Sequence, residues 1–503
     1  MSSLTKKSIL LSLSGIIDVI IRVIAAVFVT RLITNALGED LYGAWAMILQ
    51  ILGYLALANL KTTTTLQTRL AALNHSESVY PKQLVLSACR KLFTRTIGFT
   101  LIISILVVFF SSSLFPENLD SKFEIKIVLI IGVLGLVVEQ YGSLYGSALR
   151  GSNLDYKGIG IRSVTIIISN FFIILFLYFG LGIVGLAVSA LLGNLIITLS
   201  WRFLALRILT WYKIVAVSAD YFIEYFKQSL STLVYSLGNM ILVNSDAILI
   251  GIVLGNKFAG YYFISTSFIR SLVLPIVGIL LSSSGVGLSS LINSNNYNRT
   301  ISITTEILQV SSVIIGFSGF FYILFNKSLI YYWVGLKFYS DESVELLFII
   351  MVLVQFSNTL MQYLIDGLLL YKYKAIVSVF SAFFFILISV LFLKFFGLKG
   401  LILGSLLSNL LSITLYQHKL LKHRKVFIDI KAMVLRWVYL IAFFFIVDMI
   451  IKPLIQSFNL RESLFLALIS AGLLGIFAFR LLPSTFKNRI LMNNPLKLNP
   501  GKK

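Results

Sequence analysis

The chain has 503 residues, of which 58% are hydrophobic and only 12% are charged. Soluble globular domains carry about 25% charged residues, so this composition excludes an ordinary soluble enzyme or binding domain and indicates a polytopic membrane protein. The net charge of +22 does not indicate a nucleic-acid-binding protein, because the basic residues lie scattered between apolar runs.

The cysteine and histidine content argues against redox chemistry and metal binding. Cys89 is the single cysteine, so an intrachain disulfide is excluded, and the sequence has no CxxC motif or histidine-rich cluster. We therefore expect no cofactor beyond a coupling ion.

The N-terminal segment carries two lysines, Lys6 and Lys7, and continues into an apolar run that reaches about Thr30. A secretory signal would have a shorter apolar run followed by a cleavage site with small residues, which this segment lacks. We expect an uncleaved first membrane span.

Apolar segments of about 20 residues, long enough to cross a bilayer as a helix, occur about fourteen times. Because lipid cannot satisfy backbone polar groups, spans this long and this apolar must be helices, and the expected fold is all-α. The segments cover approximately residues 8–30, 41–60, 97–115, 125–149, 159–179, 181–204, 230–254, 260–285, 301–325, 343–370, 375–396, 398–417, 433–451 and 461–482.

Lysine and arginine residues are unevenly divided between the segments that connect these spans. If the N-terminus is cytoplasmic, the inside segments hold about three times as many basic residues as the outside segments. The pattern predicts cytoplasmic N- and C-termini, and it explains the net charge without nucleic acid.

The two halves of the chain resemble each other. "ALGEDLYGAWA" (residues 36–46) aligns with "VLGNKFAGYYF" (residues 253–263) at an offset of 217, and "GIVGLAVSALLGNL" (residues 182–195) aligns with "GLKGLILGSLLSNL" (residues 397–410) at an offset of 215. A weaker match lies between them. We infer a duplication in which helices 1–6 and 7–12 form the two halves.

Six spans per half is an even number, so both halves insert the same way and are related by a pseudo-two-fold axis along the membrane normal. Transporters of this kind commonly bind substrate between the halves and expose it to each side in turn. We expect an N-terminal lobe at 1–210, a cytoplasmic linker at 211–229, a C-terminal lobe at 230–425, and two additional helices with a basic cytoplasmic tail at 426–503.

The first span carries two charges near its middle, Asp18 and Arg22, one turn apart on the same helix face. A charge at bilayer depth costs about 2.5–3.5 kcal/mol or more, so it normally faces a bundle interior or a cavity. One interpretation is a pair that only fixes the helix. The other is a hydrated central cavity.

Polar residues at matching places in other spans favour the cavity. At the repeat offset, Asp18 and Arg22 correspond to Tyr235 and Asn239, and the polar stripe continues to Asp246.

Arg270 lies about ten residues, roughly 15 Å, from the outer end of its span. It is followed by Pro275, which predicts a kink. Glu139 and Gln355 occupy equivalent positions in the two halves.

The arginines indicate the charge of the substrate. Arg22 and Arg270 near the midplane, with Arg31 toward the outer end of the first span, suit a phosphate or diphosphate, because guanidinium offers a matching fork of donors. We expect substrate binding by these three residues with Asn239 and Tyr235. Three acidic residues either hold the arginines or bind a coupling proton or sodium ion: Asp18, Glu139 and Asp246.

The sequence resembles the Wzx-type polysaccharide flippases of the multidrug/oligosaccharidyl-lipid/polysaccharide exporter superfamily, which move O-antigen and capsule repeat units. The resemblance depends on "VTRLITNALGEDLYGAWAMI" (residues 29–48), on "NSDAILIGIVLGNKFAGYYFIS" (residues 244–265), and on the layout of twelve spans plus two.

The resemblance implies a flippase, not an enzyme, in the bacterial inner membrane. Its substrate would be an undecaprenyl-diphosphate-linked glycan carried from the cytoplasmic to the periplasmic leaflet, with a polymerase and chain-length proteins as partners in the same pathway. Tyr141 and Tyr145, with Tyr235, are candidate glycan contacts. Two alternatives with the same fold stay open: a lipid II type flippase and a multidrug or metabolite antiporter.

Overall fold

A computed structural model describes residues 3–57, 59–73, 78–115, 122–152, 154–278, 297–368 and 370–424, together with residues 281, 288 and 292. Within these residues the chain is helical and contains no strand, which confirms the expected all-α fold. The two expected spans at 433–451 and 461–482 lie outside the described residues.

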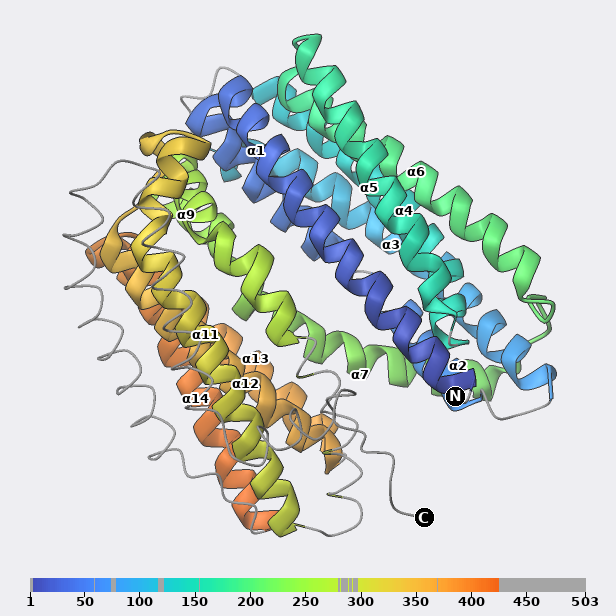
Figure 1. Cartoon of the computed structure of the whole chain (residues 1–503). Helices are drawn as coiled ribbons and strands as arrows, with labels where there is room; N and C mark the ends of the chain where they lie inside the picture. The colour runs from blue at the N-terminus through green and yellow to red at the C-terminus, as the bar shows by residue number, and fades with distance from the viewer. Residues whose placement is uncertain are drawn as a thin grey trace, which may run out of the picture. The chain divides into compact units, whose positions relative to one another are not determined.

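Figure 1 shows the described helices in chain order. Their bounds are α1 Ser3–Leu57, α2 Thr62–Ala72, α3 Tyr80–Leu114, α4 Lys122–Gly151, α5 Asp155–Tyr178, α6 Gly182–Ile208, α7 Ala219–Asn244, α8 Asp246–Leu254, α9 Asn256–Phe268, α11 Tyr297–Trp333, α12 Glu342–Gly367, α13 Tyr371–Phe396 and α14 Leu398–Arg424. A π-helical turn, η1, covers Ile269–Val273, and a 3-10 turn, η2, covers Leu336–Phe338.

The first twelve expected spans overlap described helices: the one at 230–254 covers both α7 and α8, and the one at 260–285 is described continuously to residue 278. Among the described residues, ten helices are long and apolar enough to cross a membrane, and α7 with α8, bent by 53°, meets the same criterion as a pair. The long helix α1 covers the first two expected spans. Gly38 interrupts it between them with a backbone conformation (φ 72°, ψ −170°) that residues with a side chain rarely adopt, and the helix is kinked there. The protein is therefore a multi-pass membrane protein.

The chain divides into two compact units. The first unit comprises residues 1–264, 332–338 and 378–401, and the second comprises residues 265–331, 339–377 and those from 402 onward. The expected division into lobes around a linker at 211–229 stays a prediction. Residues 219–229 form the first three turns of α7.

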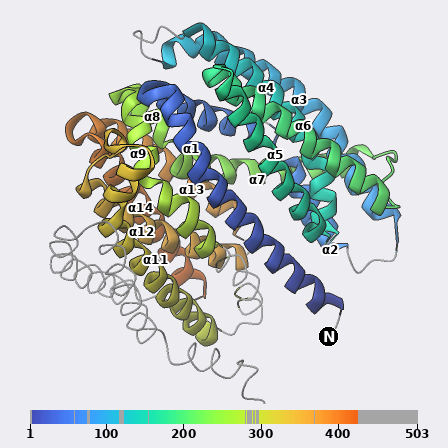
Figure 2. The same cartoon turned by 45° about the horizontal axis from the view of Figure 1, so that its top comes forward.

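In the first unit, small residues let α4 approach α6 closely (Figures 1 and 2). A Cβ atom on Gly142 would lie 2.3 Å from the Thr198 hydroxyl oxygen, and one on Gly146 would lie 2.9 Å from the Trp201 ring. The Thr198 hydroxyl donates to the Val138 carbonyl at 3.0 Å. Close packing and interhelical hydrogen bonds are the forces that associate helices in lipid.

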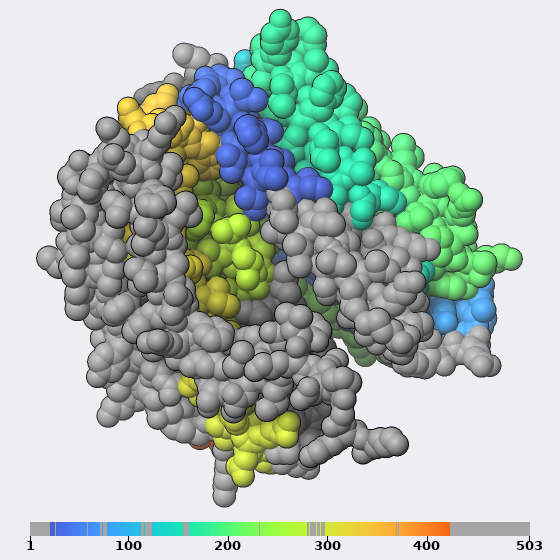
Figure 3. All heavy atoms as spheres, viewed as in Figure 1, coloured from blue at the N-terminus to red at the C-terminus, as the bar shows by residue number. Residues whose placement is uncertain are grey.

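The outward faces of α5 and α6 are apolar. Phe171 on α5 and Phe203 on α6 are 60% and 66% exposed, and the side chains of both helices form an outer face of the first unit, drawn in teal and green in Figure 3. In a membrane protein such a face contacts lipid.

The second unit is built on α11, α12 and most of α14, which lie side by side in Figures 1 and 2. Gly319 on α11 faces the Ile349 side chain on α12. The Asn358 amide on α12 donates to the Asn409 side chain on α14 at 2.8 Å, and both residues are buried. This polar residue of α12 therefore contributes to helix packing.

The most direct structural trace of the internal repeat is a contact between aligned glycines, both in the first unit. Gly43 of α1 and its counterpart Gly260 of α9 lie against each other: a Cβ atom on Gly260 would be 3.4 Å from the Gly43 nitrogen. A Cβ atom on Gly43 would be 1.8 Å from the Asn256 carbonyl oxygen, so no other residue fits there without moving a helix. A duplication with a pseudo-two-fold axis predicts that equivalent turns of the two repeats meet in this way.

Replacing Gly43 tests this close approach. We expect Gly43→Ala to lower the free energy of unfolding by about 1–3 kcal/mol, because the methyl group forces the backbones apart. The measurement is thermal unfolding of the detergent-purified protein.

The matched control is Gly98→Ala on α3, where nothing lies within 4 Å of the added atom. This change should be neutral or stabilising by up to about 1 kcal/mol, because alanine favours helix. Equal effects of the two substitutions would contradict the close contact.

Candidate functional site

The segment that carries Arg270 departs from ordinary α-helix. After α9 the backbone forms the π-helical turn η1, Ile269–Val273, and then continues as α-helix past Pro275 to Gly278. Proline has no N–H and its ring clashes with the carbonyl four residues earlier, so the turn before it must widen or bend. The expected distortion is present, but it takes the form of a π-bulge, which is frequent at functional sites.

Two buried residues contact the Arg270 guanidinium in the second unit. Its Nε donates to the Thr266 hydroxyl at 3.0 Å, and its central carbon lies 5.3 Å from the centroid of the Phe348 ring on α12. Thr266 and Phe348 are 0% and 1% exposed, whereas Arg270 itself is half-buried. The charge is thus fixed against one helix by a hydrogen bond and against another by an aromatic face.

The helical turn before Arg270 is anchored to α11. The Ser265 carbonyl accepts hydrogen bonds from the Tyr322 hydroxyl at 2.7 Å and from the Asn326 amide at 3.0 Å. Phe268 stacks on the Tyr322 ring with centroids 6.4 Å apart. The position of Arg270 is therefore set by contacts from three elements.

Asp246 is buried at the bend between α7 and α8, in the first unit. Its carboxylate accepts from the Tyr262 hydroxyl at 3.1 Å. The neighbouring Ser245 hydroxyl bonds with the Tyr54 hydroxyl, and the Gln50 side chain accepts from the Ile248 backbone N–H at 3.2 Å. As the first residue of α8, the Asp246 carboxylate is also stabilised by the helix dipole.

The other charged candidates of the first span lie on α1. Arg22 and Arg31 are exposed, on the segment before Gly38. Asp18 lies on the same helix, and its side chain is outside the described residues. The pairing of Asp18 with Arg22 stays a prediction.

The remaining candidates are spread over two helices of the first unit. Tyr235 and Asn239 are half-buried on α7, and Glu139 is exposed on α4. Arg270 belongs to the second unit and all the other candidates to the first. Among the described residues, no group of three histidine, cysteine or acidic side chains is placed to hold a metal ion.

Tyr141 and Tyr145, considered as glycan contacts, belong to an aromatic cluster of the first unit. The two rings lie 5.8 Å apart, and Tyr145 stacks on Tyr212 at 5.4 Å. Tyr145 is buried, so its ring mainly packs the core around α3 and α4.

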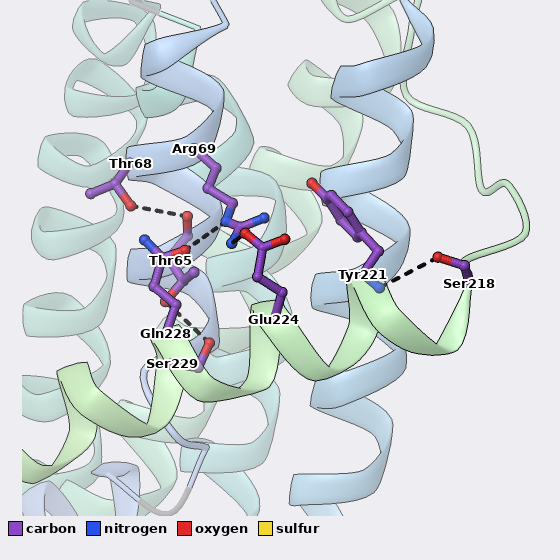
Figure 4. A network of polar contacts seen from close by, with 8 residues as sticks. All are labelled: Thr65, Thr68, Arg69, Ser218, Tyr221, Glu224, Gln228 and Ser229. Atoms are coloured by element: carbon purple, nitrogen blue, oxygen red, sulfur yellow. Dashed lines mark hydrogen bonds and ion pairs between the residues drawn. The ribbon is translucent and has the colours of Figure 1, made fainter.

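A polar network between α2 and α7 was not expected from the sequence (Figure 4). Arg69 of α2 donates to Glu224 at 2.7 Å and to Gln228 at 2.6 Å. Its guanidinium also lies 5.3 Å from the Tyr221 ring centroid. Burial acts to lower the pKa of Arg69, but the contacts with Tyr221 and Glu224 outweigh it and raise the pKa, so the group stays charged.

Further bonds extend the network into the core. The Ser229 hydroxyl donates to Thr65 at 3.1 Å, and the Tyr225 hydroxyl donates to the Thr62 carbonyl at 2.7 Å. The helix α2 lies between the expected spans at 41–60 and 97–115, where the sequence analysis expects no helix. The signal for α2 was the pair of apolar residues Leu66 and Leu70, one turn apart and both buried.

A second contact between the repeats surrounds the paired glycines. Lys257 of α9 forms an ion pair with Glu39 of α1 at 2.9 Å, and the Tyr261 hydroxyl donates to the same carboxylate. The buried Phe338 ring of η2 lies 5.9 Å from Tyr42 and 6.3 Å from Tyr261. We call Glu39, Lys257, Tyr261 and Phe338 the Gly43-end cluster.

Comparison with known proteins places the chain in a family. A family model described as "Polysaccharide biosynthesis protein" matches residues 79–341, just over half of the chain. The chain belongs to this family. No curated protein matches this sequence.

Solved structures of membrane transporters share the fold of this chain. The lipid II flippase MurJ in an inward closed conformation aligns over 97% of this chain and 100% of its own, with 15% identity and a TM-score of 0.68. An inward-facing multidrug resistance MATE transporter covers 80% of this chain and 98% of its own at 15% identity, with a TM-score of 0.61.

A third similar structure is a superfamily transporter from Pyrococcus furiosus that is described as having a binding pocket of reverse polarity. It covers 83% of this chain and 96% of its own at 15% identity, with a TM-score of 0.58. Family and fold thus confirm the resemblance found in the sequence.

The Arg69 network should stabilise the protein measurably. We expect Arg69→Lys to lower the free energy of unfolding by about 1–2 kcal/mol, because lysine cannot bond Glu224 and Gln228 together. Glu224→Gln should cost less, since the Glu224 side chain is 67% exposed. Thermal unfolding measures both.

Arg207→Lys is the control for Arg69→Lys, because it makes the same change at an exposed arginine of α6. A loss at Arg69 no greater than at Arg207 would show that the network adds no stability.

Proposed function

We propose that the protein is a flippase that moves undecaprenyl-diphosphate-linked oligosaccharides from the cytoplasmic to the periplasmic leaflet of the bacterial inner membrane. Family membership ties the chain to polysaccharide biosynthesis, and its fold is similar to that of a solved lipid II flippase. The observation that carries the proposal is Arg270, a cation held in place by buried partners within an apolar span.

A diphosphate is the ligand group that such an arginine favours. Guanidinium pairs with phosphate oxygens through parallel hydrogen bonds, and these are stronger where water is excluded. In the proposal Arg22 and Arg31 contribute further positive charge, and Asn239 and Tyr235 add polar contacts to the headgroup or the first sugars.

The proposed mechanism is alternating access between the two repeats. With the N-terminus cytoplasmic, the Gly43-end cluster lies on the periplasmic side and the Arg69 network on the cytoplasmic side. The Gly43-end cluster must then separate when the substrate leaves. Asp18, Glu139 and Asp246 are proposed to bind a coupling proton or sodium ion, or to hold the arginines.

The proposal makes this protein a transporter without catalytic residues. A polymerase and chain-length proteins of the pathway would act on its product, and no nucleic acid is involved. A lipid II type flippase is the second candidate, supported by the similarity to MurJ and by the shared diphosphate. A multidrug antiporter suits the arginines less well, since a cationic drug calls for acidic groups.

Removing the arginines tests the proposed function. We expect Arg270→Ala and Arg22→Ala each to reduce glycan export at least tenfold, because the diphosphate loses a charged partner deep in the membrane. Arg270→Lys should retain part of the activity. Surface glycan in cells that depend on this protein is the measurement, with membrane insertion checked by immunoblot.

The control is Arg207→Ala, at an exposed position away from the candidate site. Normal export by both the Arg22 and Arg270 variants would refute the proposed role. Rescue of peptidoglycan synthesis without glycan export would favour the lipid II alternative.

A cross-link tests whether the Gly43-end cluster must open. In a Cys89→Ser background, we expect Glu39→Cys with Lys257→Cys to be joined by a short bifunctional thiol reagent, because the native side chains form an ion pair. Joining them should abolish export. Reduction of a cleavable reagent should restore it.

The two single-cysteine variants serve as controls, since each takes the reagent without forming the link. Full export by the cross-linked protein would mean that this cluster stays closed during transport.

A further inference from the structure

We propose that the first unit binds an anionic phospholipid at one end of α3 and α6, with the lipid phosphate on four basic side chains and the acyl chains on the apolar residues beside them. We call these four residues the basic cluster: Arg90, Lys91 and Arg95 of α3 and Arg202 of α6. The cluster is separate from the residues proposed to bind the transported substrate, and the inference does not depend on the proposed function.

Two arginines of the basic cluster meet at the end of α4. Arg90 and Arg202 both interact electrostatically with the Tyr145 hydroxyl, although they belong to different helices. The helix that carries Tyr145, α4, packs against both α3 and α6. The fold therefore brings two positive charges that are far apart in the sequence to one place.

The other two basic side chains share one aromatic ring. The Lys91 Nζ lies 5.2 Å, and the Arg95 guanidinium carbon 4.7 Å, from the centroid of the Phe222 ring on α7. The two charges are one helical turn apart on α3, a spacing at which like charges repel each other. An anion bound beside them would remove this repulsion.

The basic cluster has no acidic counterpart in the described part of the chain. All four side chains are exposed, and no described carboxylate forms an ion pair with any of them. Other cations of the first unit differ in this respect, because Arg69 is paired with Glu224 and Lys257 with Glu39. The basic cluster therefore attracts an anion from outside the protein.

An apolar surface continues directly from the basic cluster. On α3, Arg95 is followed at seven-residue intervals by Ile102 and Phe109, which lie on the same helix face and are 59% and 75% exposed. Ile102 lies about 10 Å farther along the helix axis. On α6, Leu199 is 60% exposed and lies one turn from Arg202. Both helices thus present a charged part followed by an apolar part.

A phospholipid matches this order of charged and apolar surface. Its phosphate accepts hydrogen bonds from guanidinium and ammonium groups, and its acyl chains extend from the phosphate over the apolar residues. A soluble phosphate would use only the charged part. The distribution of lysine and arginine predicts that this end of the unit is cytoplasmic, where anionic lipids attract basic groups.

The experiment measures binding of dioleoylphosphatidylglycerol to the purified full-length protein by native mass spectrometry, with dioleoylphosphatidylcholine as the neutral lipid. One double variant, Arg90→Gln with Arg202→Gln, removes the two charges at α4. A second, Lys91→Gln with Arg95→Gln, removes the two charges at α7. Thermal unfolding of every variant is recorded beside its lipid binding.

We expect the native protein to bind the anionic lipid about fivefold or more tightly than the neutral lipid. Each double variant should reduce this preference about threefold or more, because the phosphate loses two charged partners. The matched control, Lys337→Gln with Lys394→Gln, removes the same charge from two exposed lysines elsewhere in the first unit. It should leave the preference within about 1.5-fold of the native value, since salt screens distant exposed charges.

A double variant that also unfolds at a lower temperature is judged by its charge-conserving counterpart. For the pair at α4 this is Arg90→Lys with Arg202→Lys. A retained preference for the anionic lipid would support recognition of the phosphate by charge, and a loss equal to that of the glutamine variant would overturn it.

Several other results would overturn the inference. Unchanged preference in both double variants would mean that the basic cluster is only solvated, and an equal loss in the control would mean that net charge alone attracts the lipid. Displacement of the lipid by an equal concentration of glycerol 3-phosphate would indicate a site for a soluble phosphate. Tighter binding of farnesyl diphosphate than of the phospholipid at the same four residues would assign the cluster to the transported substrate.

Discussion

A guanidinium group inside an apolar helix must be held by partners, and this constraint explains the construction around Arg270. Hydrocarbon cannot solvate the charge, so the protein supplies an acceptor from Thr266 and an aromatic face from Phe348. A proline five residues later coincides with a π-bulge that changes the path of the helix. Bonds from α11 hold the preceding turn. Together these contacts hold the Arg270 guanidinium in place, as the proposed binding of a diphosphate requires.

Elsewhere in the described structure, the helices are held together by close packing and interhelical hydrogen bonds. Because lipid offers no hydrophobic drive between helices, small residues and interhelical polar bonds hold them together, as at Gly142 and Thr198 in the first unit and Asn358 in the second. The aligned glycines of the two repeats, Gly43 and Gly260, form a close backbone contact. That contact has no room for a side chain, whereas the surrounding ion pair of Glu39 with Lys257 can break and reform.

Much of this was predictable from the sequence, for physical reasons. Hydropathy marks spans because lipid demands apolar helices, so the first twelve expected spans overlap described helices. The repeat identified Gly43 and Gly260 as equivalent. The short helix α2 was missed because eleven polar and apolar residues resemble a loop, and the bend between Asn244 and Asp246 was missed because no proline or glycine marks it. Pro275 signalled a distortion but not its π-helical form.

The account depends on recognition of a lipid-linked diphosphate, and flipping in proteoliposomes tests this most directly. The same fluorescent oligosaccharide would be attached to a prenyl diphosphate or, in a parallel preparation, to an uncharged prenyl ether, and its transfer between leaflets followed by quenching. The account predicts transfer of the diphosphate-linked glycan at least tenfold faster than that of the neutral analogue. Equal rates for the two lipids would contradict it.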